Sequence, residues 1–459
     1  MNVGFISLGC SKNLIDTEAA IGVFKKHNFK IVNEENQAQI IVINTCGFID
    51  SAKEEAINTI LEMTKYKNQN CRYIIVMGCL VQRYYDELKK ALPEVDLFIK
   101  LDEYDNLWKK IDTLIDKKDK IQKLKDNKIK QYKENKNIKI NKMPMLTQEE
   151  FLERTITTGV NYAYLKIGEG CSNMCTYCAI PYIRGPFVSR KKEDIIEEAQ
   201  ELVNKKNIKE LIVIAQDTTK YGIDIYGKAQ LPELLKELVK IKNLKWIRVL
   251  YSYPEGITQE LIDVVAKNEK ISKYFDIPIQ HISNAVLKKM NRKTNKDNIK
   301  NLIINIRDRI PNVTLRTSLI VGFPGETKED FNELLEFVKQ TKFDKLGCFK
   351  YSKEDNTPAE KMPNQIHGNT KKLRYNKIME IQQKISKEKM KEKIGNIYEV
   401  LIEEISYDKK YYIGRTMQDA PEIDGIVYIK NEKSNLINKF VNCKIINVKE
   451  YDLIGKILN

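Results

Sequence analysis

Three cysteines lie within eight residues near the middle of the chain, at Cys171, Cys175 and Cys178. The surrounding stretch, GEGCSNMCTYCAIPYIRG, contains no fourth cysteine and no histidine. Thiols at this density either form disulfides or hold a metal, and a zinc site needs a second ligand pair within about 15 to 20 residues. Three thiolates on a four-iron cluster leave one iron open to a small molecule. The spacing therefore favours an open iron–sulfur cluster, with a structural zinc knuckle or three buried thiols as the alternatives.

A second set of cysteines follows three apolar runs in the first 105 residues. VGFISLGC ends at Cys10, IIVINTC at Cys46 and YIIVMGC at Cys79, and helical patterns follow at 14–26, 51–63 and 81–92. This order predicts a parallel sheet with crossover helices, in which the carboxyl ends of the strands share one edge. We expect a second three-thiolate cluster there, with core thiols near loops as the alternative. Cys71 begins its strand, so it belongs at the opposite edge.

The region from 151 to 385 alternates strand and helix signals over a length that suggests a β/α barrel, closed or partial. The predicted strands are at 211–217, 246–254, 274–281, 314–326 and 345–352, and helices at 192–203 and 330–339 fall between them. Reactive groups of such barrels lie in the loops after the strands. Gln216 and Asp217, Gln280 and His281, and the turn of Gly322 and Gly325 occupy such positions.

Five short alternating strands follow a charged helix at 370–392, and they predict a small all-β barrel. The expected organisation is α/β: an N-terminal βαβ parallel-sheet domain at 1–105, a lysine-rich linker at 106–150, the barrel domain at 151–385 and the small β-barrel at 386–459. Within the linker, 109–142 holds thirteen lysines against five acids, which is +8 of the net +15. Because the charge gathers in one segment, it is weak support for a nucleic-acid surface, and such contact is secondary.

The composition bounds the class of protein. The chain has 459 residues, 42% of them hydrophobic, enough for about three domains with ordinary cores. No apolar run approaches the roughly 18 residues of a membrane helix, and the start, MNVGFISLGCSKN, lacks the features of a signal peptide. Nine cysteines in a cytosolic protein are more often metal ligands or free thiols than members of disulfides. We expect a cytoplasmic protein with no membrane contact.

Several motifs carry a resemblance to the radical S-adenosylmethionine (SAM) methylthiotransferases. They are LGCSKN at 8–13, NTCGFI at 44–49, GCLVQRY at 78–84, and the C-x3-C-x2-C loop with Tyr177 before its last cysteine. The resemblance covers nearly the whole chain and is weakest in the linker. It implies a partial radical-SAM barrel, a C-terminal TRAM domain and two 4Fe-4S clusters. Cys171, Cys175 and Cys178 would hold the SAM-chelating cluster, and Cys10, Cys46 and Cys79 the second cluster.

The resemblance also implies which other residues bind SAM. Segments after the barrel strands hold the ribose, carboxylate and adenine in the family, which points to six residues here: Tyr177, Gln216, Gln280, Arg316, Gly322 and Gly325. The alternative for Gln280 is an ordinary buried amide, and the two glycines most simply permit a tight turn. His281 is as consistent with a structural imidazole as with catalysis.

Two branches of the family compete for the substrate. One adds methylthio to an adenosine of transfer RNA and usually reads LGCQMN, whereas this chain has LGCSKN. The other modifies the β-carbon of an aspartate in small-subunit ribosomal protein twelve, and the segment DAPEIDG at 419–425 resembles that branch. Its acids, Asp419, Glu422 and Asp424, suit docking of a basic ribosomal protein or the 30S subunit, with a solvated surface loop as the alternative.

We favour the hypothesis that the chain resembles the ribosomal-protein branch. It implies that SAM cleavage yields a radical that removes hydrogen from the aspartate, that sulfur is then inserted, and that a second SAM methylates it. The chemistry requires an electron donor such as flavodoxin or ferredoxin. A hypothesis from another class is an iron–sulfur RNA-binding or redox-sensing protein without transferase activity, which would not produce 5′-deoxyadenosine.

Overall fold

The computed structural model describes residues 1–121, 146–431 and 435–458. Residues 122–145, the greater part of the predicted linker, lie outside this description. The chain forms two compact units. The first comprises Met1–Thr157, Glu169–Met174 and Cys178–Val188, and the second Thr158–Gly168, Cys175–Tyr177 and Ser189–Asn459. The predicted domain boundaries remain predictions.

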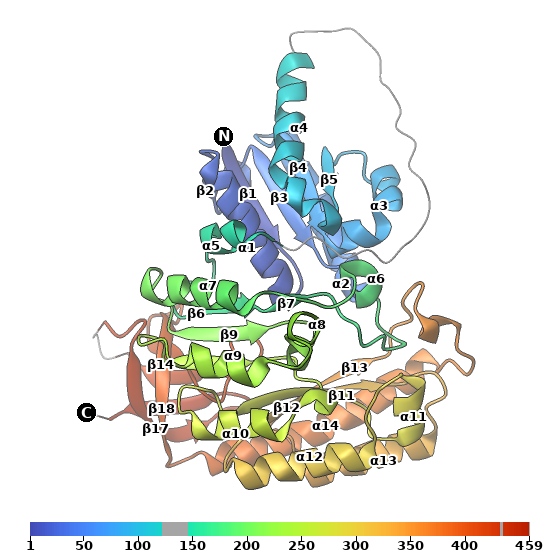
Figure 1. Ribbon diagram of the computed structural model, residues 1–459, viewed down its shortest axis with the longest axis vertical. Coiled ribbons are helices and arrows are strands. Elements are labelled where there is room, and N and C mark those ends of the chain that lie inside the picture. Colours follow the sequence, from blue (N-terminus) through green and yellow to red (C-terminus); the bar gives the residue numbers. More distant parts are fainter. Residues whose placement is uncertain (122–145, 432–434, 459) are drawn as a thin grey trace. The chain divides into compact units, whose positions relative to one another are not determined.

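The first unit is built on a five-stranded sheet with the order β2-β1-β3-β4-β5 (Figure 1). All four strand pairings are parallel, which confirms the predicted sheet. The strands are β1 (Asn2–Ser7), β2 (Lys30–Val32), β3 (Ile40–Thr45), β4 (Tyr73–Gly78) and β5 (Leu97–Ile99). The helices are α1 (Ser11–Lys26), α2 (Asp50–Thr64), α3 (Cys79–Ala91), α4 (Leu107–Ile121), α5 (Gln148–Glu153) and α6 (Ile180–Arg184).

Both faces of this sheet are buried, because strand residues alternate between two apolar cores. Ile40 and Val42 pack with Phe24 of α1 and Leu107 of α4. Ile41 and Ile43 point the other way, to α2 and α3. Burial on both faces explains the nearly continuous apolar runs of β3 and β4.

The three N-terminal cysteines stand where the central strands end. Cys10 is the N-cap residue of α1, Cys46 directly follows β3, and Cys79 is the first residue of α3. Gly78 makes the turn before Cys79 with φ of +104°, and a Cβ atom there would lie 2.2 Å from Asn44 Oδ1, so only glycine fits. Cys71 lies before β4, at the amino end, as expected.

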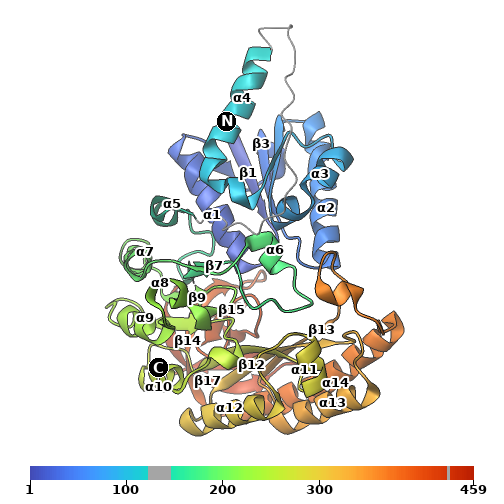
Figure 2. The same ribbon diagram turned by 45° about the vertical axis from the view of Figure 1, so that its right-hand side comes forward.

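The central part of the second unit contains six parallel strands in two three-stranded sheets (Figure 2). A parallel bridge between Ile247 and Ile271 joins the sheets, so the strands form a partial barrel. The strands are β6 (Tyr162–Lys166), β9 (Glu210–Ile214), β10 (Trp246–Val249), β11 (Tyr274–Gln280), β12 (Thr314–Val321) and β13 (Lys345–Lys350). The short strands β7 (Gly168–Glu169) and β8 (Val188–Ser189) pair beside the cysteine loop.

Helices connect the barrel strands and lie outside them. They are α7 (Lys192–Asn204), α8 (Ile223–Tyr226), α9 (Leu231–Leu238), α10 (Gln259–Lys267), α11 (Asn284–Lys289), α12 (Lys296–Arg309), α13 (Lys328–Thr341) and α14 (Gly368–Glu392). Because each strand is followed by a returning helix, all the strands run in the same direction and their carboxyl ends open at one end of the barrel. In the part of the chain that the structure describes, no helix is long and apolar enough to cross a membrane.

The C-terminal region is a closed five-stranded barrel with the order β14-β15-β16-β18-β17. Its strands, β14 (Ile397–Ile405), β15 (Tyr411–Thr416), β16 (Val427–Lys430), β17 (Phe440–Val448) and β18 (Leu453–Ile457), confirm the five predicted strands. Val400, Ile429 and Ile445 fill its core. The bulge in β14 between Ile402 and Glu404 helps a small sheet to close.

This small barrel packs against the amino ends of the central strands, within the second unit. Arg415 of β15 is buried, and its guanidinium donates to Glu210, the first residue of β9, at 2.7 Å. Glu210 also accepts from the buried Arg248 at 2.8 Å, and Glu403 accepts from Arg415 at 2.8 Å. Trp246, the first residue of β10, packs edge-on against Phe440 with ring centroids 4.9 Å apart.

We expect Arg415→Met to weaken this junction strongly. The substitution removes one member of a buried charge network and leaves Glu210 with one cation, which costs on the order of 3–5 kcal/mol of unfolding free energy. Urea titration, followed by Trp246 fluorescence in a Trp108→Phe background, measures the loss. The matched control is Arg309→Met, because Arg309 pairs with Asp263 on the surface and its loss should be far smaller. Equal effects of the two substitutions would contradict this account of the junction.

Candidate active site

The segments that carry Cys10, Cys46 and Cys79 are in contact at the carboxyl edge of the first sheet. A Cβ atom on Gly9 would lie 3.0 Å from the Cys46 sulfur, so Gly9 must be glycine for the Cys10 and Cys46 loops to approach. Cys79 Sγ donates to Asn13 Oδ1 at 3.4 Å, in the first turn of the helix that Cys10 begins. The topology therefore brings together three cysteines from positions far apart in the sequence.

Charges and burial act in opposite directions on these three thiols. Burial raises the pKa of Cys79 to about 12, although the Arg184 cation opposes it, and burial also raises the pKa of Cys46. Cys10 is only partly exposed, and this burial also acts to raise its pKa, but Lys12, Arg184 and the backbone N–H groups of Asn13 and Lys12 outweigh it and lower the pKa. Cys10 and Cys46 both contribute to the raised pKa of Cys79, so the sulfur atoms are near enough to interact.

Asn13 links the three cysteine loops. Its side-chain nitrogen donates to Leu8 O at 3.1 Å and to Thr45 O at 3.0 Å, just before Cys10 and Cys46. Its side-chain oxygen accepts from Cys79, as described above, and from Arg184 Nη2 at 2.6 Å. Sequence reasoning missed both Asn13 and Arg184. Asn13 lies inside the LGCSKN motif, which was the signal that could have found it.

The three-thiol site fits an iron–sulfur cluster. Sulfur-only donors select zinc, copper(I) or iron–sulfur clusters, and the positive charges of Lys12 and Arg184 favour the thiolate forms that such clusters require. Within the described residues, no three His, Cys, Asp or Glu side chains are arranged to hold a single metal ion. The thiolates of a four-iron cluster bind separate irons, so they need not converge on one point.

The second cysteine set lies in the loop between β7 and α6, after the first barrel strand. Cys171 is buried, and its backbone N–H donates to Gly185 O at 3.0 Å in the first unit. Cys178 is partly exposed. Cys175, also buried, lies in the second unit and accepts from Arg292 Nη1 at 3.8 Å.

Backbone bonds and packing in the second unit fix the loop around Cys175. Thr176 N donates to Met290 O at 3.1 Å, and Thr176 O accepts from Ala359 N at 2.9 Å. The Tyr177 ring packs edge-on against Phe323, with centroids 6.5 Å apart. Tyr177 therefore touches the turn that follows β12, which contains two of the predicted SAM-binding glycines.

Arg292 is a further residue that sequence reasoning missed. Its side chain is buried and lies over the Tyr253 ring at 4.3 Å, and Nη2 donates to Pro278 O at 3.0 Å. It lies in the MNRK segment after α11, where nothing but its charge distinguishes it. Its position places a permanent cation beside one cysteine of the loop.

The predicted SAM-binding residues of the barrel lie on or just after its strands. Gln216 follows β9 and is partly exposed, and Gln280 ends β11 with φ of +68°, a conformation unusual for a residue other than glycine. Arg316 lies in β12, where Nη1 donates to Asp276 at 3.0 Å. Gly322 and Gly325 both have φ of +72° and form the turn after β12, in which Glu326 accepts from the Gly322 and Phe323 N–H groups.

His281 has at least a structural role. It is fully buried, and Nδ1 accepts from Ser283 N at 3.0 Å. The other ring nitrogen, Nε2, has no hydrogen-bond partner among the described residues and lies 3.9 Å from Glu326 Oε1. The imidazole thus connects the end of β11 to the turn after β12.

The interpretation of Asp419 as a docking residue is wrong. Asp419 is 3% exposed, and Lys345 Nζ donates to it at 2.8 Å. Burial would raise the pKa of this carboxyl group, but the Lys345 and Lys393 cations hold it below its usual range. Glu422 and Asp424 already accept from the hydroxyl groups of Tyr162 and Tyr274, both at 2.7 Å. A count of acidic residues could not show that this loop faces the amino ends of β6, β11 and β13.

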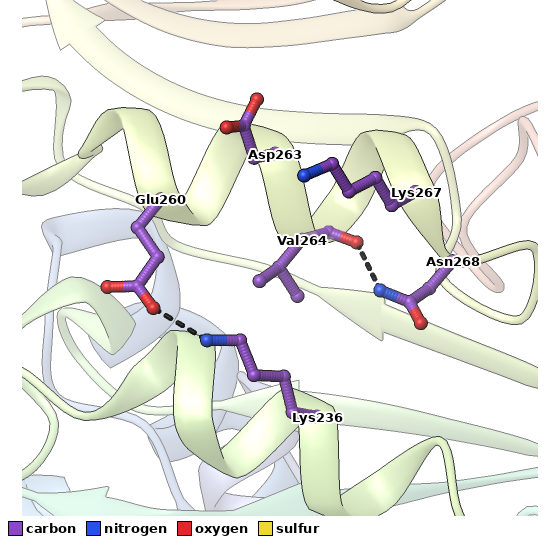
Figure 3. A pocket seen from close by; sticks show the side chains of 6 residues that line it. All are labelled: Lys236, Glu260, Asp263, Val264, Lys267 and Asn268. Carbon is purple, nitrogen blue, oxygen red and sulfur yellow. Dashed lines mark hydrogen bonds and ion pairs between the residues drawn. The ribbon is translucent and has the colours of Figure 1, made fainter.

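A charged hollow between α9 and α10 lies away from the strand carboxyl ends (Figure 3). Lys236 donates to Glu260 at 2.6 Å and Asn268 donates to Val264 O at 2.7 Å, and Asp263 and Lys267 complete the lining. The residues near the end of α10 precede β11, so they lie toward the amino ends of the strands. The hollow is lined by surface ion pairs and we assign it no chemistry.

Three family models match the chain in succession. Residues 2–100 match "Uncharacterized protein family UPF0004", residues 165–338 the "Radical SAM superfamily" and residues 394–458 the "TRAM domain". Among solved structures, the radical S-adenosylmethionine methyltransferase TsrM from Kitasatospora setae, with cobalamin and a [4Fe-4S] cluster bound, is similar in fold. Its TM-score is 0.55 at 11% identity, over 78% of this chain and 73% of that one.

Full-length relatives show the family. "Ribosomal protein uS12 methylthiotransferase RimO" of Alkaliphilus oremlandii is 59% identical over 100% of this chain and 99% of that protein. The protein of the same name from Clostridioides difficile is 49% identical over 100% of this chain and 99% of its own length. With the two cysteine sets and all three domain types in place, the chain belongs to the RimO family of radical-SAM methylthiotransferases.

Proposed function

We propose that this enzyme adds a methylthio group to the β-carbon of an aspartate in ribosomal protein uS12, using SAM and two 4Fe-4S clusters. One observation carries the proposal: three cysteines from separate strand ends meet in a thiol-only site, in a chain that also has an independent C-x3-C-x2-C loop. A radical-SAM enzyme needs the loop alone to cleave SAM. The second thiol site supports sulfur insertion as the additional chemistry.

The cofactors, when bound, would supply the one-electron cleavage of SAM, the hydrogen abstraction and the site of sulfur insertion. The protein holds and shields them, since an unactivated C–H bond offers no acid or base handle. Cys171, Cys175 and Cys178 hold the SAM-chelating cluster, and Cys10, Cys46 and Cys79 the other. Arg292, through its contact with Cys175, keeps a positive charge at the first of these sites.

SAM itself is held, in this proposal, at the carboxyl ends of the barrel strands. Gln216 and Gln280 offer amide groups to its ribose and carboxylate, and the backbone of Gly322 and Gly325 allows close approach of the adenine. Arg316, near the start of β12, adds a cation whose orientation is fixed by Asp276. Tyr177 closes the loop side, and its packing against Phe323 connects the two regions.

The cellular setting follows from the substrate. A ribosomal protein is modified where ribosomes are, so the enzyme acts in the cytoplasm. Its reducing electrons come from a small carrier of the flavodoxin or ferredoxin class. Nucleic-acid contact is secondary, because the C-terminal region from residue 390 to 459 has eleven basic and eleven acidic residues.

Two cysteine substitutions should separate the roles of the two thiol sites. Cys175→Ala should abolish reductive formation of 5′-deoxyadenosine, because it removes a ligand of the SAM-chelating cluster. Cys46→Ala should keep that reaction and lose methylthio transfer by more than tenfold. Chromatography of anaerobic reactions containing dithionite measures both products.

The control for these variants is Cys71→Ala, a buried cysteine at the opposite edge of the same sheet. It should keep both reactions. Iron content of each purified variant shows whether one cluster or both have been lost. Loss of SAM cleavage in Cys46→Ala to the same degree as in Cys175→Ala would refute the division of roles.

The substrate is tested in cells. Mass spectrometry of uS12 from strains with and without this gene should find the methylthio mass on an aspartate only when the gene is present. An unmodified uS12 in both strains, together with gene-dependent methylthioadenosine in transfer RNA, would reject the ribosomal substrate in favour of the nucleic-acid one.

A further inference from the structure

Arg184 is a buried cation that the proposed chemistry has not yet used. It ends α6, six residues after Cys178, and its side chain is 2% exposed. Nη1 donates to both carboxylate oxygens of Glu169 at 3.0 Å, and Nη2 donates to Asp16 at 2.9 Å and to Asn13 at 2.6 Å. Of the five guanidinium donors, the Nε–H group alone has no partner among the described residues.

The guanidinium lies beside the three-thiol site. Its charge acts on the pKa values of Cys10, Cys46 and Cys79. It also holds the Asn13 amide, whose other contacts reach all three cysteine loops. A single side chain thus supplies charge to the site and fixes the residue that joins its loops.

The same segment supports the other cysteine set through its backbone. Gly185 O, one residue after Arg184, accepts from Cys171 N at 3.0 Å. Both contacts belong to the first compact unit. Two consecutive residues therefore connect the SAM-cluster loop to the three-thiol site.

Fixed charges near a cluster set its reduction potential, because reduction adds an electron and a nearby cation stabilises the added charge. Burial strengthens the effect by lowering the local dielectric constant. Here Arg184 and Lys12 are positive, and Asp16 and Glu169 are negative, all within the buried surroundings of the thiols. A cluster at the site would experience the combined electrostatic potential of these four charges.

We propose that Arg184 is a positioning residue that raises the reduction potential of the cluster on Cys10, Cys46 and Cys79, with its charge beside the thiolates and its side chain holding Asn13 between their loops. The inference rests on the proposed function, which assigns a cluster to these thiols. It adds a role for a residue that is not a ligand.

The test uses the full-length chain with Cys171, Cys175 and Cys178 replaced by alanine, so that only the cluster in question remains. After anaerobic reconstitution, the midpoint potential is measured by redox titration of the electron paramagnetic resonance signal of the reduced cluster. Arg184→Gln should shift the potential to a more negative value. Arg184→Lys, which keeps the charge, should stay nearer the parent. Glu169→Gln should shift it the opposite way, because it removes a negative charge.

Arg154→Gln is the matched control. Arg154 is also buried and donates at 2.7 Å to Glu18, a carboxylate on the same helix as Asp16. Its loss breaks a similar buried ion pair, and Arg154 is not among the main charges that act on the pKa values of the three thiols. It should leave the potential at the parent value, which separates a charge effect from general destabilisation.

The outcomes are distinct. An unchanged potential in Arg184→Gln at full iron content overturns the inference, as does an equal shift in Arg154→Gln. If Arg184→Gln cannot hold iron, Glu169→Gln decides, and the absence of a positive shift there overturns the inference. A parent chain that binds no iron rejects the proposed cluster itself, which is a failure of the proposed function and not of the role of Arg184.

Discussion

The cost of placing three thiolates close together in a largely buried site is the constraint on which the N-terminal unit of this enzyme depends. Burial disfavours each thiolate, and each negative sulfur disfavours the next. Cys79 shows the cost most clearly, since burial raises its pKa to about 12. Nearby cations, the N-termini of helices and a bound metal cluster can each offset this cost. The chain places Lys12, Arg184 and the first turns of α1 and α3 at this edge of the sheet. The parallel sheet brings the three cysteines together, because the carboxyl ends of neighbouring parallel strands share one edge.

The C-terminal barrel covers the amino end of the central barrel, which would otherwise be exposed. Polar groups at the first residues of β6, β9, β11 and β13 find partners in the small barrel, and Trp246 of β10 finds an aromatic one. The carboxyl ends are left for chemistry. This division of the two ends explains why three acidic residues in the C-terminal region serve the chain itself: they accept from two tyrosine hydroxyl groups and a partly buried lysine.

Much of the architecture could be predicted from local pattern. Apolar runs that each end in a cysteine identified the parallel sheet and the three-thiol edge, and the strands of the small barrel were found because period-two alternation is a short-range property. Arg184 could not be found in this way, since its meaning depends on Asn13, 171 positions earlier. The prediction of Asp419 as a docking residue was wrong for the same reason. Its charge was plain, but its partner Lys345 lies 74 positions away, and composition does not reveal which surface a loop faces.

The closing of the central barrel by β15 and its neighbours also bears on how the chain is made. Glu210 and Arg415 are separated by 205 positions in the sequence. Arg248 and Glu210 therefore become buried beside Arg415 only after β15, which is synthesised much later, has folded. Domains commonly fold in order of synthesis, but here the amino end of the middle one is covered only by the last. During that interval its amino-end charges stay hydrated and its strand starts uncovered. The amino end of the nascent central barrel is therefore open to chaperones until the small barrel has been made.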